Sequence, residues 1–180
     1  MDRVDKRPWI ALFSQTGGEI VSISSAIGRL PDLIITNKRP ENLRKIHPLL
    51  ENRYTEVSNT PSDKELLKLF KKYENPFITL HGWLRIVPPS LCNTFEIYNG
   101  HPGLITDFPE LKGKDPQEKA HRLGLPYSGC VIHKVTEGVD EGPILKSGKI
   151  SIENLELPEI FDKLYSLSLK LWIDFLKEKL

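Results

Sequence analysis

Two polar side chains follow an apolar stretch in the segment "YNGHPG", residues 98–103. Asn99 and His101 come directly after Phe95 and Ile97, so a strand ending here would present an amide and an imidazole at its carboxyl end. Both groups can donate hydrogen bonds to a developing oxyanion, which is a strong form of transition-state stabilisation. The alternative is structural, because Asn-Gly is a common turn dipeptide and Pro102 ends any strand before it.

A carboxylate suited to the same chemistry occurs further along the chain, in "TEGVDEGP", residues 136–143. Asp140 would favour a protonated imidazole at His101 and could remove a proton from a reacting nitrogen through a water molecule. Taken alone, Asp140 followed by Glu141-Gly142-Pro143 would normally be a turn between strands. His133 is interpreted as a structural residue packed near this site, and His81 is left open between a substrate contact and a structural role.

A metal site could be drawn from His81, His101, His133 and Asp140, but their spacing matches no common ligand pattern. The two cysteines, Cys92 and Cys130, match none either. We therefore expect no metal. Two cysteines do not indicate a disulfide scaffold, so a reducing cytoplasm is the expected location.

The elements that would position these groups alternate along the chain. Buried strands are predicted over 9–14, 31–37, 76–80, 128–135 and 142–152. Helices are predicted over 19–27, 62–73, 115–124 and 158–180, with Ser62 and Asp115 as caps of capping boxes. This alternation predicts an α/β fold: an open, mostly parallel, twisted sheet with helices on both faces. In such sheets ligands bind at the carboxyl ends of the strands, where "SQTGG", "NGH" and "TEGVDEGP" would lie.

Length and charge exclude several classes of protein. The 180 residues carry a formal net charge of +1 and are 39% hydrophobic, which fits one globular domain over residues 1–180. A near-neutral chain does not indicate a nucleic-acid partner. The start, "MDRVDKRPW", has no apolar run behind its charges, so it is not a signal peptide, and no run is long enough to span a bilayer.

The motifs "ITLHGWLRIVPPSL", "YNGHPG", "SGCVIHKVTEGVDEGPIL" and "SQTGGEI" together resemble the formyltransferase family that uses 10-formyltetrahydrofolate. Within that family the chain is most similar to the single-domain glycinamide ribonucleotide formyltransferases. The resemblance implies a Rossmann-like formyltransferase fold and an enzyme that transfers a formyl group to a primary amine. The implied acceptor is a small molecule of nucleotide or sugar-phosphate type, and the implied assembly is a monomer or homodimer.

The resemblance also implies a role for each motif. The implied catalytic residues are Asn99, His101 and Asp140. The implied folate site consists of Leu84, Arg85, Ile86, Val87, Thr136, Glu137, Gly138 and Val139. The implied acceptor site consists of Gly17, Gly18, Glu19, Gly82 and Pro102, with the two glycines holding a phosphate at the start of a helix.

The chain departs from the family on the acceptor side. Glu19 follows the glycines, and a carboxylate there would repel a phosphate. Either its side chain points away and the backbone binds the phosphate, or it binds a cation or a hydroxyl. The glutamate with which the family grips ribose hydroxyls corresponds to Ser168, and the segment after Pro102 also differs.

Two other functions fit the same motifs. One is a hydrolase that releases formate from the same folate, and the other is a folate- or nucleotide-binding module without activity. Transfer to a tRNA is disfavoured, because in this family it goes with an additional carboxyl-terminal domain.

Overall fold

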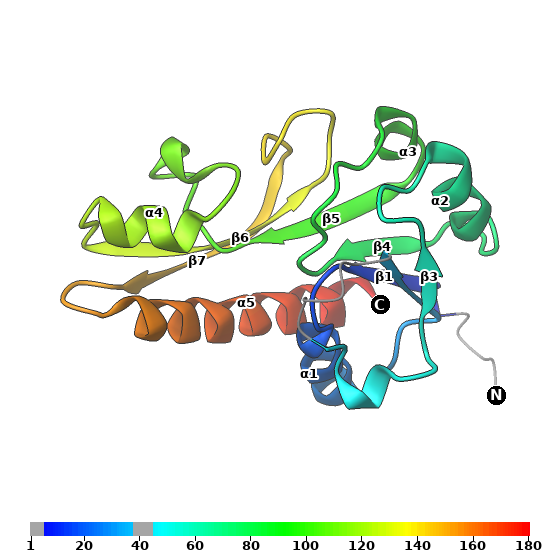
Figure 1. Ribbon diagram of the computed structural model, residues 1–180, viewed down its shortest axis with the longest axis horizontal. Coiled ribbons are helices and arrows are strands. Elements are labelled where there is room, and N and C mark those ends of the chain that lie inside the picture. The colour runs from blue at the N-terminus through cyan, green and yellow to red at the C-terminus, as the bar shows by residue number, and fades with distance from the viewer. Residues whose placement is uncertain (1–5, 38–44) are drawn as a thin grey trace.

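The computed structural model describes residues 6–37 and 45–180 (Figure 1). The expectation about the charged start of the chain falls partly on residues 1–5, outside the described residues. None of the described helices is both long and apolar enough to cross a membrane.

Within these residues, seven strands form one sheet in the order β3-β2-β1-β4-β5-β6-β7 (Figure 1). The strands are β1 (Trp9–Phe13), β2 (Leu33–Asn37), β3 (Thr55–Val57), β4 (Phe77–Leu80), β5 (Glu96–His101), β6 (Tyr127–Lys134) and β7 (Ile144–Ser151). Strands β1 to β5 are parallel, whereas β6 is antiparallel to β5 and β7 to β6. The predicted open, mostly parallel sheet is confirmed.

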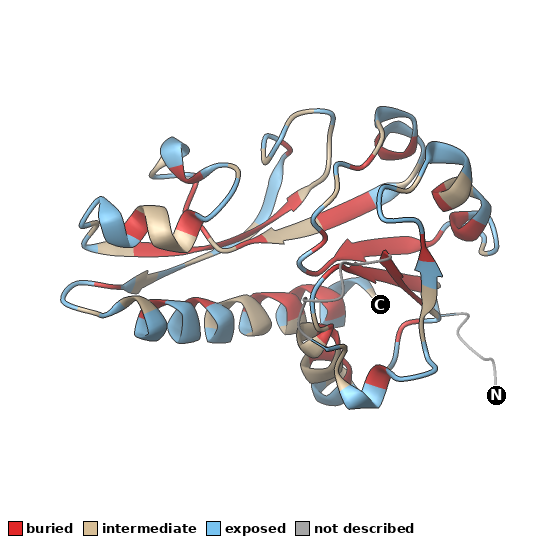
Figure 2. Ribbon diagram, viewed as in Figure 1, coloured by how far each residue is buried: buried red, intermediate tan, exposed pale blue. Residues whose placement is uncertain are grey.

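Helices cover both faces of the sheet (Figure 1). They are α1 (Gly18–Ile27), α2 (Asp63–Phe70), α3 (Pro89–Thr94), α4 (Pro116–Arg122) and α5 (Leu157–Lys179), with short 3-10 turns η1 (Pro48–Leu50) and η2 (Pro109–Leu111). Side chains of α1 and α5 belong to one apolar cluster and those of α2 and α3 to another, on the opposite side of the sheet. Figure 2 shows the buried strands of the sheet between these two layers.

The burial of the strands follows from this layering. All five residues of β1 and all four of β4 are buried, which explains their continuous apolar sequences. β7 lies at the edge of the sheet, and its residues alternate between exposed and half-buried. The centre of the sheet is therefore packed on both faces, and the ends of β1, β4 and β5 can position polar groups.

Some short elements differ from the sequence prediction. β3 and α3 were not predicted, because three and six residues carry too little periodicity to reveal a strand or helix held by tertiary contacts. Ser62 caps α2 as predicted, but the Glu65 carboxylate accepts from Ser58 instead of closing the capping box. Asp115 precedes α4 in a left-handed conformation, φ 55°, and its side chain makes no cap hydrogen bond, so that part of the prediction was wrong.

The strand order reverses beside β1. The chain adds β2 and β3 on one side of β1 and then returns to add β4 on the other. At such a point the connections leave the sheet in opposite directions and open a space at the carboxyl ends of the strands, where ligands of open α/β sheets bind. Here that position lies after Phe13 in β1 and after Leu80 in β4.

Candidate active site

The carboxyl end of β5 carries Asn99 and His101. They are two residues apart, so their side chains lie on the same face of the strand. The antiparallel strand β6 places His133 directly opposite Asn99, with 3.4 Å between Asn99 Nδ2 and His133 Nε2. The pairing of β5 with β6 therefore brings a second imidazole to this end of the sheet.

Asp140 lies between the two imidazoles. Its Oδ2 is 3.4 Å from His101 Nδ1, and its Oδ1 is 3.2 Å from His133 Nε2. The loop between β6 and β7 supplies Asp140 in a left-handed conformation, φ 52°, which few non-glycine residues adopt. The backbone N–H of Gly113 donates to Oδ2 at 2.8 Å. The structure thus brings Asn99, His101 and Asp140 together, and it adds His133.

Both imidazoles use their outer nitrogen to donate to a backbone carbonyl. His101 Nε2 is 2.7 Å from the Leu111 oxygen, and His133 Nδ1 is 3.1 Å from the Lys134 oxygen. A carbonyl oxygen only accepts, so these two nitrogens carry protons. An inner nitrogen can donate to Asp140 only if its ring carries a second proton. The cluster is arranged to take up a proton, which the carboxylate and the imidazoles would share.

Burial determines the resting charges of this cluster. Burial lowers the pKa of His101, and this effect outweighs the opposing influence of Asp140 and of the Leu111 carbonyl. Burial acts to raise the pKa of Asp140, but the His133 hydrogen bond, His101 and the Gly113 N–H together hold that pKa below its ordinary value. At neutral pH the free protein therefore has an ionised Asp140 beside a neutral His101. The protonated His101 expected from the sequence is not the resting form, because the side chain is desolvated.

The two segments expected to bind folate lie next to each other. The Cys92 thiol in α3 is 3.6 Å from the Val87 carbonyl oxygen and 3.9 Å from that of Thr136. Next to these joined segments, Leu84, Ile86 and Val139 expose apolar side chains, with 56%, 78% and 56% of their surface accessible. Exposed apolar side chains mark a binding surface when they form one contiguous patch.

Other residues of the expected folate segments are held by hydrogen bonds. The Arg85 guanidinium donates to the carbonyl oxygen of Asn59 at 2.8 Å and to its side-chain oxygen at 2.6 Å. The Leu84 N–H donates to Ser14 Oγ at 3.0 Å. Glu137 accepts from Asn93 at 3.3 Å, and Gly138 packs against the side chain of Glu141.

The expected acceptor residues lie around the start of α1 and the ends of β4 and β5. Gly17 precedes α1 with φ 74°, and a Cβ there would come within 2.4 Å of Leu50 Cδ1, so the position requires glycine. Gly82 is exposed with φ 66° and follows β4, and Pro102 is half-buried directly after β5. Glu19 lies in the first turn of α1, and its carboxylate points inward to His81, 2.8 Å away.

The sequence predicts His133 as a structural residue near the site and leaves the role of His81 open. His81 is 5% exposed and is held between Glu19 and Thr79, which favours the structural one of its two predicted roles. His133 directly contacts Asp140 and Asn99. Only the pairing of β5 with β6 reveals this, and the signal available in the sequence was a lone histidine two residues beyond Val131.

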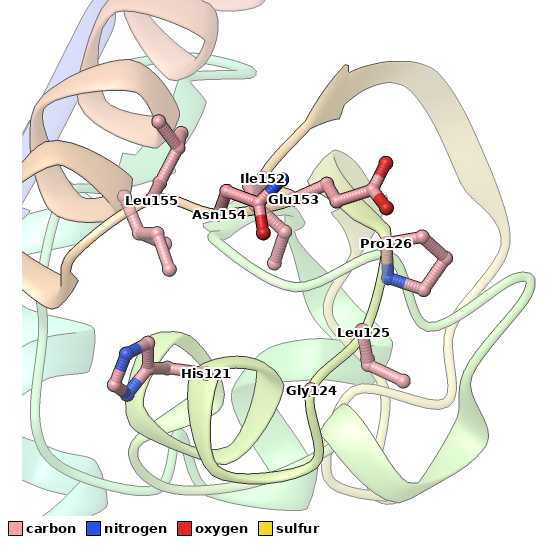
Figure 3. A pocket seen from close by; sticks show the side chains of 9 residues that line it. His121, Gly124, Leu125, Pro126, Ile152, Glu153, Asn154 and Leu155 are labelled. Atoms are coloured by element: carbon pink, nitrogen blue, oxygen red, sulfur yellow. The ribbon is translucent and has the colours of Figure 1, made fainter.

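A cavity of about 360 Å³ lies elsewhere, between the end of α4, the start of β6 and the turn before α5 (Figure 3). It is lined by His121, Gly124, Leu125, Pro126, Ile152, Glu153, Asn154, Leu155 and Ile160. None of these is a candidate catalytic residue. Over residues 6–37 and 45–180, no group of three histidine, cysteine, aspartate or glutamate side chains is placed to hold a metal ion.

The family model described as "Formyl transferase" matches residues 14–164. The chain therefore belongs to the formyl transferase family, as the motifs predicted, and the co-substrate of that family is 10-formyltetrahydrofolate.

Two curated relatives show the range of acceptors in this family. The chain is 30% identical over 115 residues to a methionyl-tRNA formyltransferase of Thermosipho melanesiensis, covering 63% of this chain and 37% of that protein. It is 29% identical over 121 residues to a phosphoribosylglycinamide formyltransferase of Bacillus subtilis, covering 66% of this chain and 60% of that protein. The chain thus matches less than two thirds of the length of either relative.

Solved structures confirm the fold. A phosphoribosylglycinamide formyltransferase from Bacillus halodurans has a TM-score of 0.76 at 24% identity, over 93% of this chain and 92% of that chain. One from Anaplasma phagocytophilum has a TM-score of 0.83 at 19% identity, over 96% and 86%. The predicted formyltransferase fold is confirmed.

Proposed function

We propose that this protein transfers the formyl group of 10-formyltetrahydrofolate to the primary amine of a small acceptor, with Asn99, His101 and Asp140 as its catalytic residues. The observation that carries the proposal is the position of Asp140 between two imidazoles, one of which also contacts Asn99. Formyl transfer needs a donor for an oxyanion and a group that accepts a proton from nitrogen. This cluster supplies both.

The proposed reaction proceeds through a tetrahedral intermediate. The amine attacks the formyl carbon, a C–N bond forms, and the formyl oxygen becomes an oxyanion that the Asn99 amide stabilises by donating a hydrogen bond. The excess proton leaves the attacking nitrogen, through a water molecule, for the His101–Asp140 pair. The pair returns it to N10 of the folate as the C–N10 bond breaks, and the products are a formamide and tetrahydrofolate.

The folate is proposed to bind along residues 84–87 and 136–139. The backbone of these segments would match the polar edge of the pterin, while the exposed side chains of Leu84, Ile86 and Val139 would cover its apolar ring faces. All of these groups belong to the one sheet and its connections, so we propose that residues 1–180 act as a single catalytic domain.

The proposed acceptor is a nucleotide-like or sugar amine that lies among Gly17, Gly18, Glu19, Gly82 and Pro102. Binding of a phosphate at Gly17 and Gly18 would require Glu19 to turn outward, and in the structure its carboxylate points inward. We therefore expect poor use of glycinamide ribonucleotide, with kcat/KM below about 10⁴ M⁻¹s⁻¹, the low end for ordinary enzymes.

The experiment is a transfer assay with 10-formyltetrahydrofolate and a panel of acceptors. The panel contains amino sugars, their phosphates, glycinamide ribonucleotide and initiator methionyl-tRNA, and mass spectrometry detects the formamide. Formation of a formamide with a small amine supports the proposal. If formate is released and no amine of the panel is formylated, the protein is a hydrolase. If the folate binds and neither a formamide nor formate is formed, the protein is a binding module.

A further inference from the structure

Glu19 is both held in place and reachable from solvent. Its Oε1 is 2.8 Å from His81 Nδ1, and the Ser168 hydroxyl of α5 donates to Oε2 at 3.2 Å. The carboxylate side chain nevertheless keeps 20% of its surface accessible, whereas that of His81 keeps none. Two partners thus fix the carboxylate from the inside while its outer side stays open to a ligand.

The partners of Glu19 are hydrogen-bond donors. The Trp9 indole N–H donates to Thr79 Oγ1 at 2.8 Å, and Thr79 Oγ1 is 2.8 Å from His81 Nε2. Since an indole only donates, Thr79 Oγ1 accepts from it. A carboxylate oxygen only accepts, so His81 Nδ1 donates to Glu19. Each carboxylate oxygen of Glu19 thus accepts one hydrogen bond and has a further lone pair.

The two partners of Glu19, His81 and Ser168, are themselves held in place by packing. The His81 ring lies against the ring of Trp172, with 4.6 Å between the centroids. Trp172 is fully buried and packs on Gly100, the residue between Asn99 and His101. Ser168 and Trp172 are one turn apart on α5, so the same helix face contacts both Glu19 and the end of β5. Glu19 is thus linked to the end of β5 through His81 and Trp172.

The topology places Glu19 where a ligand of such a sheet binds. Glu19 follows β1 and His81 follows β4, the two strands between which the strand order reverses. A ligand that occupied this point would meet the accessible side of that carboxylate at contact distance. Repulsion between two like charges at such a distance exceeds the favourable effect of a helix N-terminus on an anion.

On the basis of the proposed function, we propose that Glu19 accepts hydrogen bonds from hydroxyl groups of a sugar-like part of the acceptor and excludes phosphate from Gly17 and Gly18. Each oxygen can accept one further hydrogen bond, which suits a pair of neighbouring hydroxyls. Glu19 is in this view a specificity-determining residue, and the acceptor carries no phosphate at this position.

The test compares the wild-type protein with Glu19→Gln, which keeps the size of the side chain and removes its charge. Asp174→Asn, an exposed carboxylate on α5, is the matched control. Inorganic phosphate and D-ribose are titrated separately and followed by ligand-observed NMR. We expect Glu19→Gln to bind phosphate at least about tenfold more tightly than the wild type and ribose at least about fivefold more weakly, with no change in Asp174→Asn.

Equal phosphate affinity in the wild type and Glu19→Gln, or unchanged ribose binding, would overturn the proposal. Should Glu19→Gln fail to fold, a phosphate Kd of the wild type below about 1 mM would overturn it as well, and a higher one would support it. A folate analogue is titrated in parallel. If the folate analogue does not bind while phosphate and ribose behave as expected, the proposed formyl transfer is rejected and the proposed selectivity of Glu19 stands.

Discussion

Asp140 has two imidazoles and a backbone N–H around it, and each contact serves the ionised carboxylate or a proton shared with it. We expect Asp140→Asn and His101→Asn each to lower turnover by at least about a hundredfold, the range for a positioned acid–base group. The double variant is expected to be little worse than either single one, because the two residues act as a unit.

Steady-state kinetics with the best acceptor measure this prediction, and Asp174→Asn serves as the control. Additive losses in the double variant would show that Asp140 and His101 perform separate steps.

The burial of His101 also links stability to pH. Its pKa in the folded protein lies below the value of an unfolded histidine, about 6.5. Between these two values the unfolded chain binds more protons, so stability falls as pH drops through this window. The lowered pKa of Asp140 acts in the same direction at more acidic pH.

We expect His101→Gln to lose less stability than the wild type between pH 7.5 and 5.5. Urea unfolding at the two pH values measures the difference. A larger loss in His101→Gln would mean that His101 is charged in the folded protein.

The backbone of β5 near its carboxyl end lies directly against a side chain of α5, with no room for a larger residue between them. A Cβ at Gly100 would lie 2.6 Å from Trp172 Nε1, and Trp172 is fully buried. We expect Gly100→Ala to cost about 1–3 kcal/mol of unfolding free energy, as overpacking of a core does. Combining it with Trp172→Phe should cost less than the sum of the two changes, because the smaller ring leaves room.

Chemical unfolding of the single and double variants gives the coupling energy. If the costs simply add, the contact between Gly100 and Trp172 does not constrain the end of β5.

The elements predicted from sequence are those with many apolar residues in a regular pattern. Strand β1 and helix α5 could be recognised, because continuous burial and helical spacing leave clear signals. The three-residue β3 could not, because only pairing with β2 defines it. The same limit applies to the site. Asn99 and His101 lie two residues apart, so the sequence alone shows them together. The contact of His133 with Asp140 and that of Glu19 with Ser168 arise only from strand pairing and helix packing.

On the scale of the whole molecule, a bound folate would connect two segments that are not paired with each other in the sheet. Residues 84–87 and 136–139 are far apart in sequence and meet at the Cys92 thiol. A ligand that binds only the folded protein stabilises it by about 2.7 kcal/mol at a hundred times its Kd. For a chain of this size, that corresponds to a rise in melting temperature of about 5–10 °C.

We therefore expect a folate analogue at that concentration to raise the melting temperature by about this amount in the wild type and equally in His101→Ala, because the imidazole acts on the formyl group and does not hold the pterin. In Ile86→Asp the rise should disappear, since a charge replaces an exposed apolar side chain against which the ring would lie. Differential scanning fluorimetry with and without the analogue measures all three. A shift lost in His101→Ala but kept in Ile86→Asp would make His101 a pocket residue and would move the folate away from residues 84–87.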